Sequence, residues 1–130
     1  LSSGPRRLLN KYRGEIWVAD LNPRTGTEPG KTRPVLLVQA QALIAAKHPS
    51  TLVVPLTTNL VDEAEPLRIR IAAQGDLRHD SDLLIDQLRA IDNVRLVTGP
   101  LTMLSDDQMA LVDRAISDVL DLPEPRTRPE

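Results

Sequence analysis

The chain has 130 residues, a net charge of -2 and no cysteine. This length predicts one domain with a sizeable buried core. The nearly balanced charge argues against a protein that coats nucleic acid indiscriminately. The missing cysteines exclude disulfides and thiol catalysis. No window approaches the roughly 20 apolar residues of a membrane span, and residues 6–11 lack the apolar stretch of a secretory signal, so we expect a cytoplasmic protein.

The first half of the chain predicts three strands and one short helix. Residues 15–21 and 34–38 are apolar strands, and a loop rich in Gly, Thr and Pro connects them through residues 24–32. The second strand is apolar enough to be covered on both faces. Ala-rich residues 39–47 favour a short helix, and residues 52–56 form the third strand.

The second half predicts further short strands. Residues 62–66 form an acidic turn, and residues 67–71 alternate between apolar and Arg side chains, which is typical of a strand with one face in the core. Residues 83–91 are expected to form one strand, with Gln87 and Arg89 on the same face. A strand at 94–97 follows, and Gly99-Pro100 is expected to break it.

One clear helix is expected over residues 105–121. Ser105 is a suitable N-cap, and Gln108 completes a capping box. Met109, Val112 and Ile116 line one side and indicate core packing. Many short strands with one reliable helix at the end predict a mainly β, α+β fold: a small, strongly bent antiparallel sheet or barrel with helices attached.

An arginine stands at the junction between the 24–32 loop and the second strand. Pro34 fixes its own φ and pushes Arg33 toward an extended conformation, so this position can aim a side chain. A guanidinium grips pairs of phosphate oxygens. The third strand delivers Thr57-Thr58-Asn59 into a loop in the same way. If the two strands are neighbours, Arg33 and Thr57 converge in a phosphate-handling site.

Several motifs then carry a family resemblance, because they keep their order and spacing over residues 13–121. The chain resembles the MazF/PemK toxin family through RGEIW at 13–17, DLNP at 20–23, GTEPG at 26–30, RPVL at 33–36, VPLT at 54–57 and DQLR at 86–89. We therefore expect residues 13–121 to be a single toxin domain. Residues 1–12 are expected to be an N-terminal arm and residues 122–130 a disordered tail.

The resemblance implies an SH3-like barrel homodimer that cleaves single-stranded RNA sequence-selectively. It implies no metal and no cofactor. Attack by the ribose 2′-hydroxyl would leave a 2′,3′-cyclic phosphate and a 5′-hydroxyl, and a cognate antitoxin would occupy the RNA groove with a disordered acidic tail. The family's catalytic arginine and threonine fall on Arg33 and Thr57. The substrate-binding residues are expected at Thr27, Glu28, Asn59, Gln87 and Arg89.

The general base is not fixed by the sequence. A guanidinium stays protonated near neutrality, which makes Arg33 a charge stabiliser rather than a ready proton acceptor. Glu28 is the chemically easier base, but its distance from the site cannot be derived from the sequence. Gln87 and Arg89 fit substrate binding and a dimer interface equally well.

For the remaining polar residues, a structural or solvent-facing role is favoured over a catalytic or binding role. Arg68 and Arg70 indicate a solvated strand face rather than a secondary RNA contact. The aspartates at 80, 82 and 86 indicate a solubilising face rather than a cation site. His48 is a weak candidate, because it precedes Pro49 in an expected surface turn. His79 is also weak, because adjacent residues in Arg78-His79-Asp80-Ser81 cannot form a Ser-His-Asp relay. Tyr12 and Trp17 are the whole aromatic set, so base stacking is largely unavailable.

Two competing functions remain at this stage. One is a non-catalytic CcdB-like toxin that binds and poisons DNA gyrase. That class depends on a C-terminal Trp-Gly-Ile, whereas this chain ends Thr-Arg-Pro-Glu at 127–130. The other is a barrel that binds RNA or peptide without turnover, against which the Arg33/Thr57 pair argues.

Overall fold

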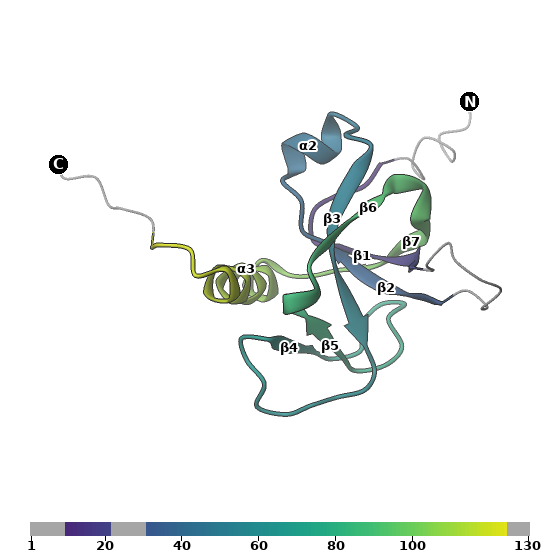
Figure 1. Ribbon diagram of the computed structural model, residues 1–130. Helices are drawn as coiled ribbons and strands as arrows, with labels where there is room; N and C mark the ends of the chain where they lie inside the picture. Colours follow the sequence, from purple (N-terminus) through teal and green to yellow (C-terminus); the bar gives the residue numbers. More distant parts are fainter. Residues whose placement is uncertain (1–9, 22–30, 125–130) are drawn as a thin grey trace.

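The computed structural model describes residues 10–21 and 31–124 (Figure 1). Seven strands and a C-terminal helix dominate these residues, whereas the sequence predicted six strands before that helix. The elements in chain order are β1 (Glu15–Asp20), β2 (Thr32–Leu37), α2 (Gln41–Ala45), β3 (Ser50–Thr57), β4 (Arg68–Ile71), β5 (Ser81–Leu84), the 3-10 turn η1 (Ile85–Gln87), β6 (Arg89–Asp92), the 3-10 turn η2 (Asn93–Arg95), β7 (Leu96–Met103) and α3 (Asp106–Leu120).

All strand pairs are antiparallel and form one bent sheet. The strand order is β4-β5-β3-β2-β1-β7, and β6 pairs with β3 off this path. The long strand β3 is the centre of the arrangement, because β2 lies along one edge while β6 and then β5 share the other. The predicted small antiparallel α+β barrel-like fold is confirmed. Among the described helices, none has the length and hydropathy needed to cross a membrane.

The sheet separates two hydrophobic clusters. Successive residues of β2 and β3 point to opposite faces, so Leu36 and Val54 enter one cluster while Val35, Leu37 and Val53 enter the other. This arrangement confirms that the second strand is covered on both faces. It holds β2 and β3 rigidly at the point where they reach the candidate site.

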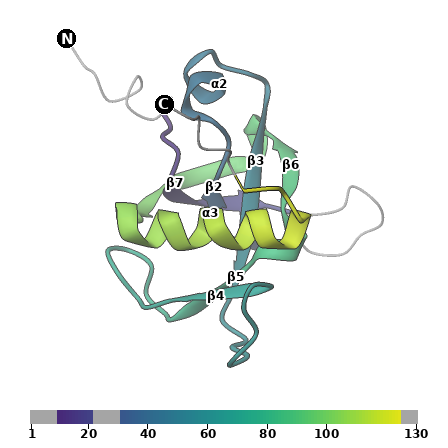
Figure 2. The ribbon, with the colours of Figure 1, turned by 90° about the vertical axis from the view of Figure 1, so that its left-hand side faces the viewer.

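Helix α3 closes the larger cluster. Figure 2 shows it lying crosswise over the sheet. Met109, Val112 and Ala115 of this helix are buried there. The Ser105 hydroxyl accepts a hydrogen bond from the Gln108 backbone N–H, and the Gln108 side chain accepts one from the Ser105 N–H, so the predicted capping box is present.

The expected single strand over 83–91 is wrong, because η1 interrupts it. Leu56 pairs with Leu83, whereas Val53, only three residues earlier on β3, pairs with Arg89, six residues later. The three additional residues on this side are taken up by η1. The sequence pattern could not show this offset, since it depends on how two strands share one edge of β3.

The expected break at Gly99-Pro100 is also wrong, since β7 runs through both residues. Pairing between β7 and β1 shifts register twice along this stretch, which allows a proline within a strand. Gly99 lies against the Trp17 ring: an added Cβ would come within less than 3.0 Å of three ring carbons. A glycine is therefore required by the close approach rather than by a chain break.

Candidate active site

Arg33 and Thr57 line the same cavity of about 420 Å³. Arg33 lies on β2, where Ala19 of β1 pairs with it on one side. On the other side, Val35 pairs with Pro55 of β3, so Arg33 and Thr57 each lie two residues beyond the last pair of these neighbouring strands. Both side chains are half-buried. The convergence that the sequence suggested is therefore found, and two buried strands fix it.

The Thr57 hydroxyl is oriented by its own turn. Its oxygen accepts a hydrogen bond from the Asn59 backbone N–H at 3.1 Å. A hydroxyl has one proton to donate and two acceptor positions, so this contact leaves the Thr57 proton available to a group in the cavity. The carbonyl of Asn59 in turn accepts from the Arg68 guanidinium at 2.8 Å.

A second cavity, of about 270 Å³, adjoins the first through Arg33. Gln87, the last residue of η1, and Arg89, the first residue of β6, line it together with Arg33 and Pro55. The irregular η1 therefore does not separate Gln87 from Arg89 in space. Both side chains are exposed and face the cavity that Arg33 shares.

Three predicted site residues are not found among those that line these cavities in the described part of the chain. Asn59 is not among the residues that line the two cavities, and its described contacts are made by its backbone. Thr27 and Glu28 lie outside the described residues. Their positions relative to Arg33 remain predictions.

The loop between β4 and β5 supplies site residues that sequence reasoning missed. Asp76, Arg78 and His79 line the cavity of Arg33 and Thr57. A loop has no periodicity from which the orientation of its side chains can be derived, so the sequence alone does not indicate these residues. Arg78 and His79 also line a third cavity beside the first. The three cavities share lining residues, with Arg33 common to the first and second and His79 common to the first and third, and we call them together the groove.

A sequence model described as PemK-like, MazF-like toxin of type II toxin-antitoxin systems matches residues 12–120. The chain belongs to this family. The MazF-like chain is 37% identical over 106 residues to a Bacillus subtilis (strain 168) protein named endoribonuclease EndoA, covering 80% of this chain and 89% of that protein.

Solved structures agree on the MazF-like fold. The Mycobacterium tuberculosis toxin MazF-mt6 superposes with a TM-score of 0.69 at 23% identity, over 85% of this chain and 99% of that chain. A Deinococcus radiodurans structure titled MazE-MazF superposes with a TM-score of 0.72 at 19% identity, over 87% of this chain and 97% of that chain. At these identities the likeness concerns the fold.

The interpretation of Arg68 and Arg70 as a solvated face holds only in part for this MazF-like chain, because both partly exposed arginines pair with a buried carboxylate. Asp82 is 1% exposed, and its carboxylate accepts from Arg70 Nε at 2.5 Å and from Arg68 Nη1 at 3.2 Å. The Val61 backbone N–H donates to the same carboxylate at 2.9 Å. Residue alternation identified the face of β4 that carries the arginines, but not the buried carboxylate from β5 that covers it.

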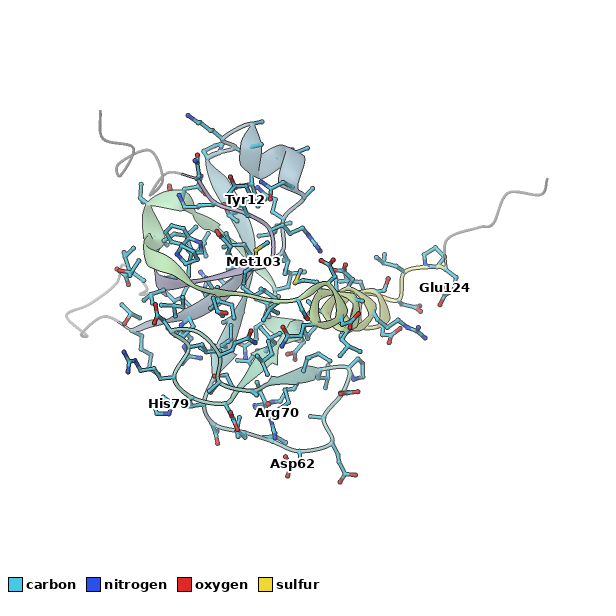
Figure 3. The ribbon with its side chains drawn as sticks, turned by 180° about the vertical axis from the view of Figure 1, so that it is seen from behind. Tyr12, Asp62, Arg70, His79, Met103 and Glu124 are labelled. Atoms are coloured by element: carbon cyan, nitrogen blue, oxygen red, sulfur yellow. The ribbon has the colours of Figure 1, made fainter. Side chains whose placement is uncertain are left out.

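This network shifts the pKa values of two of its members in the directions that favour their charged forms. Burial alone raises the pKa of Asp82, but hydrogen bonds from Arg70, the Val61 N–H and Arg68 outweigh it, so the net pKa is lowered. Hydrogen bonds to Asp82 and then Asp62 raise the pKa of Arg70. Figure 3 shows Arg70 and Asp62 at the same end of the molecule.

The predicted solubilising face of aspartates is correspondingly wrong at Asp82. The Asp80 carboxylate accepts from the Ala73 N–H at 2.8 Å. Within the described ranges, no group of three or more His, Cys, Asp or Glu gathers to hold a metal ion.

The Ser81 hydroxyl donates to the His79 carbonyl at 3.0 Å. This contact uses the His79 backbone and not its ring, as expected if no Ser-His-Asp relay forms.

Proposed function

We propose that this chain is an endoribonuclease toxin that cleaves single-stranded RNA sequence-selectively and without a metal ion. The observation that carries the proposal is the shared cavity of Arg33 and Thr57 on neighbouring strands. The family assignment and the endoribonuclease name of the Bacillus subtilis relative support it. The groove around this cavity presents Lys31, Arg33, Arg78 and Arg89 on a chain whose net charge is -2.

The cleavage chemistry is proposed as attack by the ribose 2′-hydroxyl. The 2′ oxygen forms a bond to phosphorus, the bond from phosphorus to the 5′ oxygen breaks, and the products are a 2′,3′-cyclic phosphate and a 5′-hydroxyl. The 2′ proton leaves to a base, and the departing 5′ oxygen takes up a proton. Extra negative charge develops on the non-bridging oxygens in the transition state.

Arg33 and Thr57 are proposed to stabilise that charge. A guanidinium donates two parallel hydrogen bonds to phosphate oxygens, and the Thr57 hydroxyl has its proton free for a third. Gln87 and Arg89 are proposed to bind the strand beside the cut, because they line the cavity that adjoins Arg33. Thr27, Glu28 and Asn59 stay proposed substrate contacts on the family resemblance, with Glu28 as a candidate base.

The proposed partners are a second copy of the chain and a cognate antitoxin. A similar mycobacterial structure is described as an endoribonuclease in complex with its cognate antitoxin, and the Deinococcus radiodurans structure as MazE-MazF. A cationic groove on an acidic molecule suits an acidic, extended segment that folds on binding. Val97 and Met103 of β7, at the end of the sheet order, are exposed apolar residues suited to a homodimer.

Incubation of the purified protein with a long single-stranded RNA in EDTA tests the function. The expected result is cuts at defined sequences that end in 2′,3′-cyclic phosphates and 5′-hydroxyls, and that disappear in Arg33→Ala. Inhibition of gyrase without RNA cleavage would instead favour the CcdB-like function. RNA binding without cuts would indicate a non-catalytic module.

A further inference from the structure

His79 stands on the wall between two parts of the groove. It lines the cavity that contains Arg33 and Thr57, and it also lines the adjoining cavity beside Leu60 and Asp80. The side chain is exposed. An RNA strand that reaches from Arg33 and Thr57 into the adjoining cavity would therefore meet His79, which borders both.

The loop that carries His79 is held on both sides of it. Leu77 is 4% exposed and anchors one side in the core, where its N–H also donates to the Gln74 carbonyl at 2.9 Å. On the other side, the Asp80 carboxylate accepts from the Ala73 N–H, and the Ser81 hydroxyl donates to the His79 carbonyl. A ring on a fixed backbone loses little freedom when a ligand binds to it.

The aromatic residues of the chain cannot take this place. Trp17 is 3% exposed, and its indole N–H donates to Glu15 at 3.0 Å inside the fold. Figure 3 places Tyr12 at the opposite end of the molecule from His79. Among the described residues that line the cavity of Arg33 and Thr57, His79 is the one side chain with a planar ring.

We infer that the imidazole of His79 is a stacking platform for the base of a nucleotide next to the scissile phosphate. The inference rests on the proposed function. Single-stranded RNA is held by splaying out bases and stacking them on His or aromatic rings and on Arg guanidinium planes. Arg78 lines the same two cavities and presents such a plane beside the ring. His79 is thus a substrate-positioning residue in the same cavity as the pair that acts on the phosphate.

The test compares His79→Ala, His79→Phe and His79→Gln with the wild-type protein. Binding is measured to a short RNA that carries the mapped cut site with a 2′-O-methyl group in place of the nucleophile. We expect His79→Ala to weaken binding about 5- to 150-fold, His79→Phe to restore it because the ring is kept, and His79→Gln to behave like Ala. In cleavage of the unmodified RNA, KM should rise while kcat stays near the wild-type value.

Two controls isolate the ring. His48→Ala removes another exposed histidine, in the turn between α2 and β3, and should leave binding unchanged. With an RNA that is abasic at the contacted nucleotide, the wild-type protein and His79→Ala should bind equally, because no base is left to stack. Circular dichroism confirms that each exposed-site variant is folded.

The outcomes separate this inference from the function on which it rests. Normal binding by His79→Ala in a protein that cleaves RNA would overturn the platform and leave the ribonuclease standing. Rescue by Gln rather than by Phe would also overturn it, since a hydrogen bond and not a ring would then be required. A wild-type protein that cuts no RNA would reject the proposed function, and the same binding series with a mixed-sequence RNA would still decide the role of His79.

Discussion

Arg33 and Thr57 face one cavity from the ends of adjacent antiparallel strands, and their register rather than any loop sets their separation. The strands that hold them bury Val35, Leu36 and Val54 completely. A positioned cation and a positioned hydroxyl are thereby ready before a ligand arrives. Such preorganised donors supply large terms in transition-state stabilisation.

The first prediction concerns these two donors together. Arg33→Ala is expected to lower the single-turnover rate of RNA cleavage by about 100- to 1000-fold, since one donor to the transition state is lost. Thr57→Val should also lower the rate, whereas Thr57→Ser keeps the hydroxyl and should retain most of it. The double variant should lose less than the product of the two single losses, because both donors act on one phosphate.

Arg114→Ala is the control for this series, because Arg114 is an exposed residue of α3 that pairs with Asp118. Its cleavage rate should equal that of the wild-type protein. Fully multiplicative losses in the double variant would contradict a shared target for Arg33 and Thr57.

The second prediction concerns Arg89 and salt. If Arg89 contacts an RNA phosphate from the cavity it shares with Arg33, Arg89→Ala releases one counterion fewer on binding. The slope of log affinity against log salt should then fall in magnitude by about 0.7. Fluorescence anisotropy over a salt series measures this slope, and an unchanged slope, equal to that of Arg114→Ala, would assign Arg89 another role.

The third prediction concerns the buried carboxylate of Asp82. Asp82→Asn should destabilise the fold by roughly 1–3 kcal/mol at pH 7, because it removes the charge that two partly exposed arginines pair with. The pKa of Asp82 is lowered in the folded state, so its contribution is complete above the ordinary carboxyl value of 3.8 and is lost as the pH falls through the lower folded value. The stability gap between the two proteins should therefore shrink in acid.

Denaturant titrations at several pH values measure that gap. Asp62→Asn is the matched control, since its side chain is 83% exposed and pairs with the same Arg70. Its effect should stay below about 1 kcal/mol. A gap for Asp82→Asn that widens toward acid would contradict the direction of the shift.

The fourth prediction concerns Gly99. Gly99→Ala places a methyl group on the Trp17 ring and should cost roughly 1–3 kcal/mol, as overpacking in a core does. Thr98→Ala, on the exposed neighbouring position of β7, should be nearly neutral. Tryptophan fluorescence follows the unfolding of both variants directly. An unfolding midpoint of Gly99→Ala equal to that of the wild-type protein would show that the Trp17 ring shifts without loss of stability.

Much of the fold and part of the site could be predicted from residues that are close together in the sequence. The cap at Ser105, the alternation at 67–71 and the apolar strands at Arg33 and Thr57 are consequences of neighbouring residues, so the sequence indicates them. Features that depend on distant partners could not be predicted in this way. The turn η1 arises from the offset on β3, and burial of Asp82 arises from two arginines of β4.

The site also combines features set by neighbouring residues with features set by distant partners. Gln87 and Arg89 reach one cavity although the strand expected to align them is broken. Asn59 was expected as a side-chain contact, but its described role is to fix the Thr57 turn with its backbone. His79 was set aside with its sequence neighbours, because no pattern within a loop shows which distant strands it faces.

The groove has one wall made of interior strands and another made of a surface loop that Leu77 anchors. Under the proposed function, the pair that acts on the phosphate and the loop that holds a neighbouring base thus belong to separate parts of the chain. Exchange of residues 75–80 for those of another family member is then expected to alter how tightly RNA is held while Arg33 and Thr57 keep their positions. Evolution could adjust such a surface loop without disturbing the buried strands.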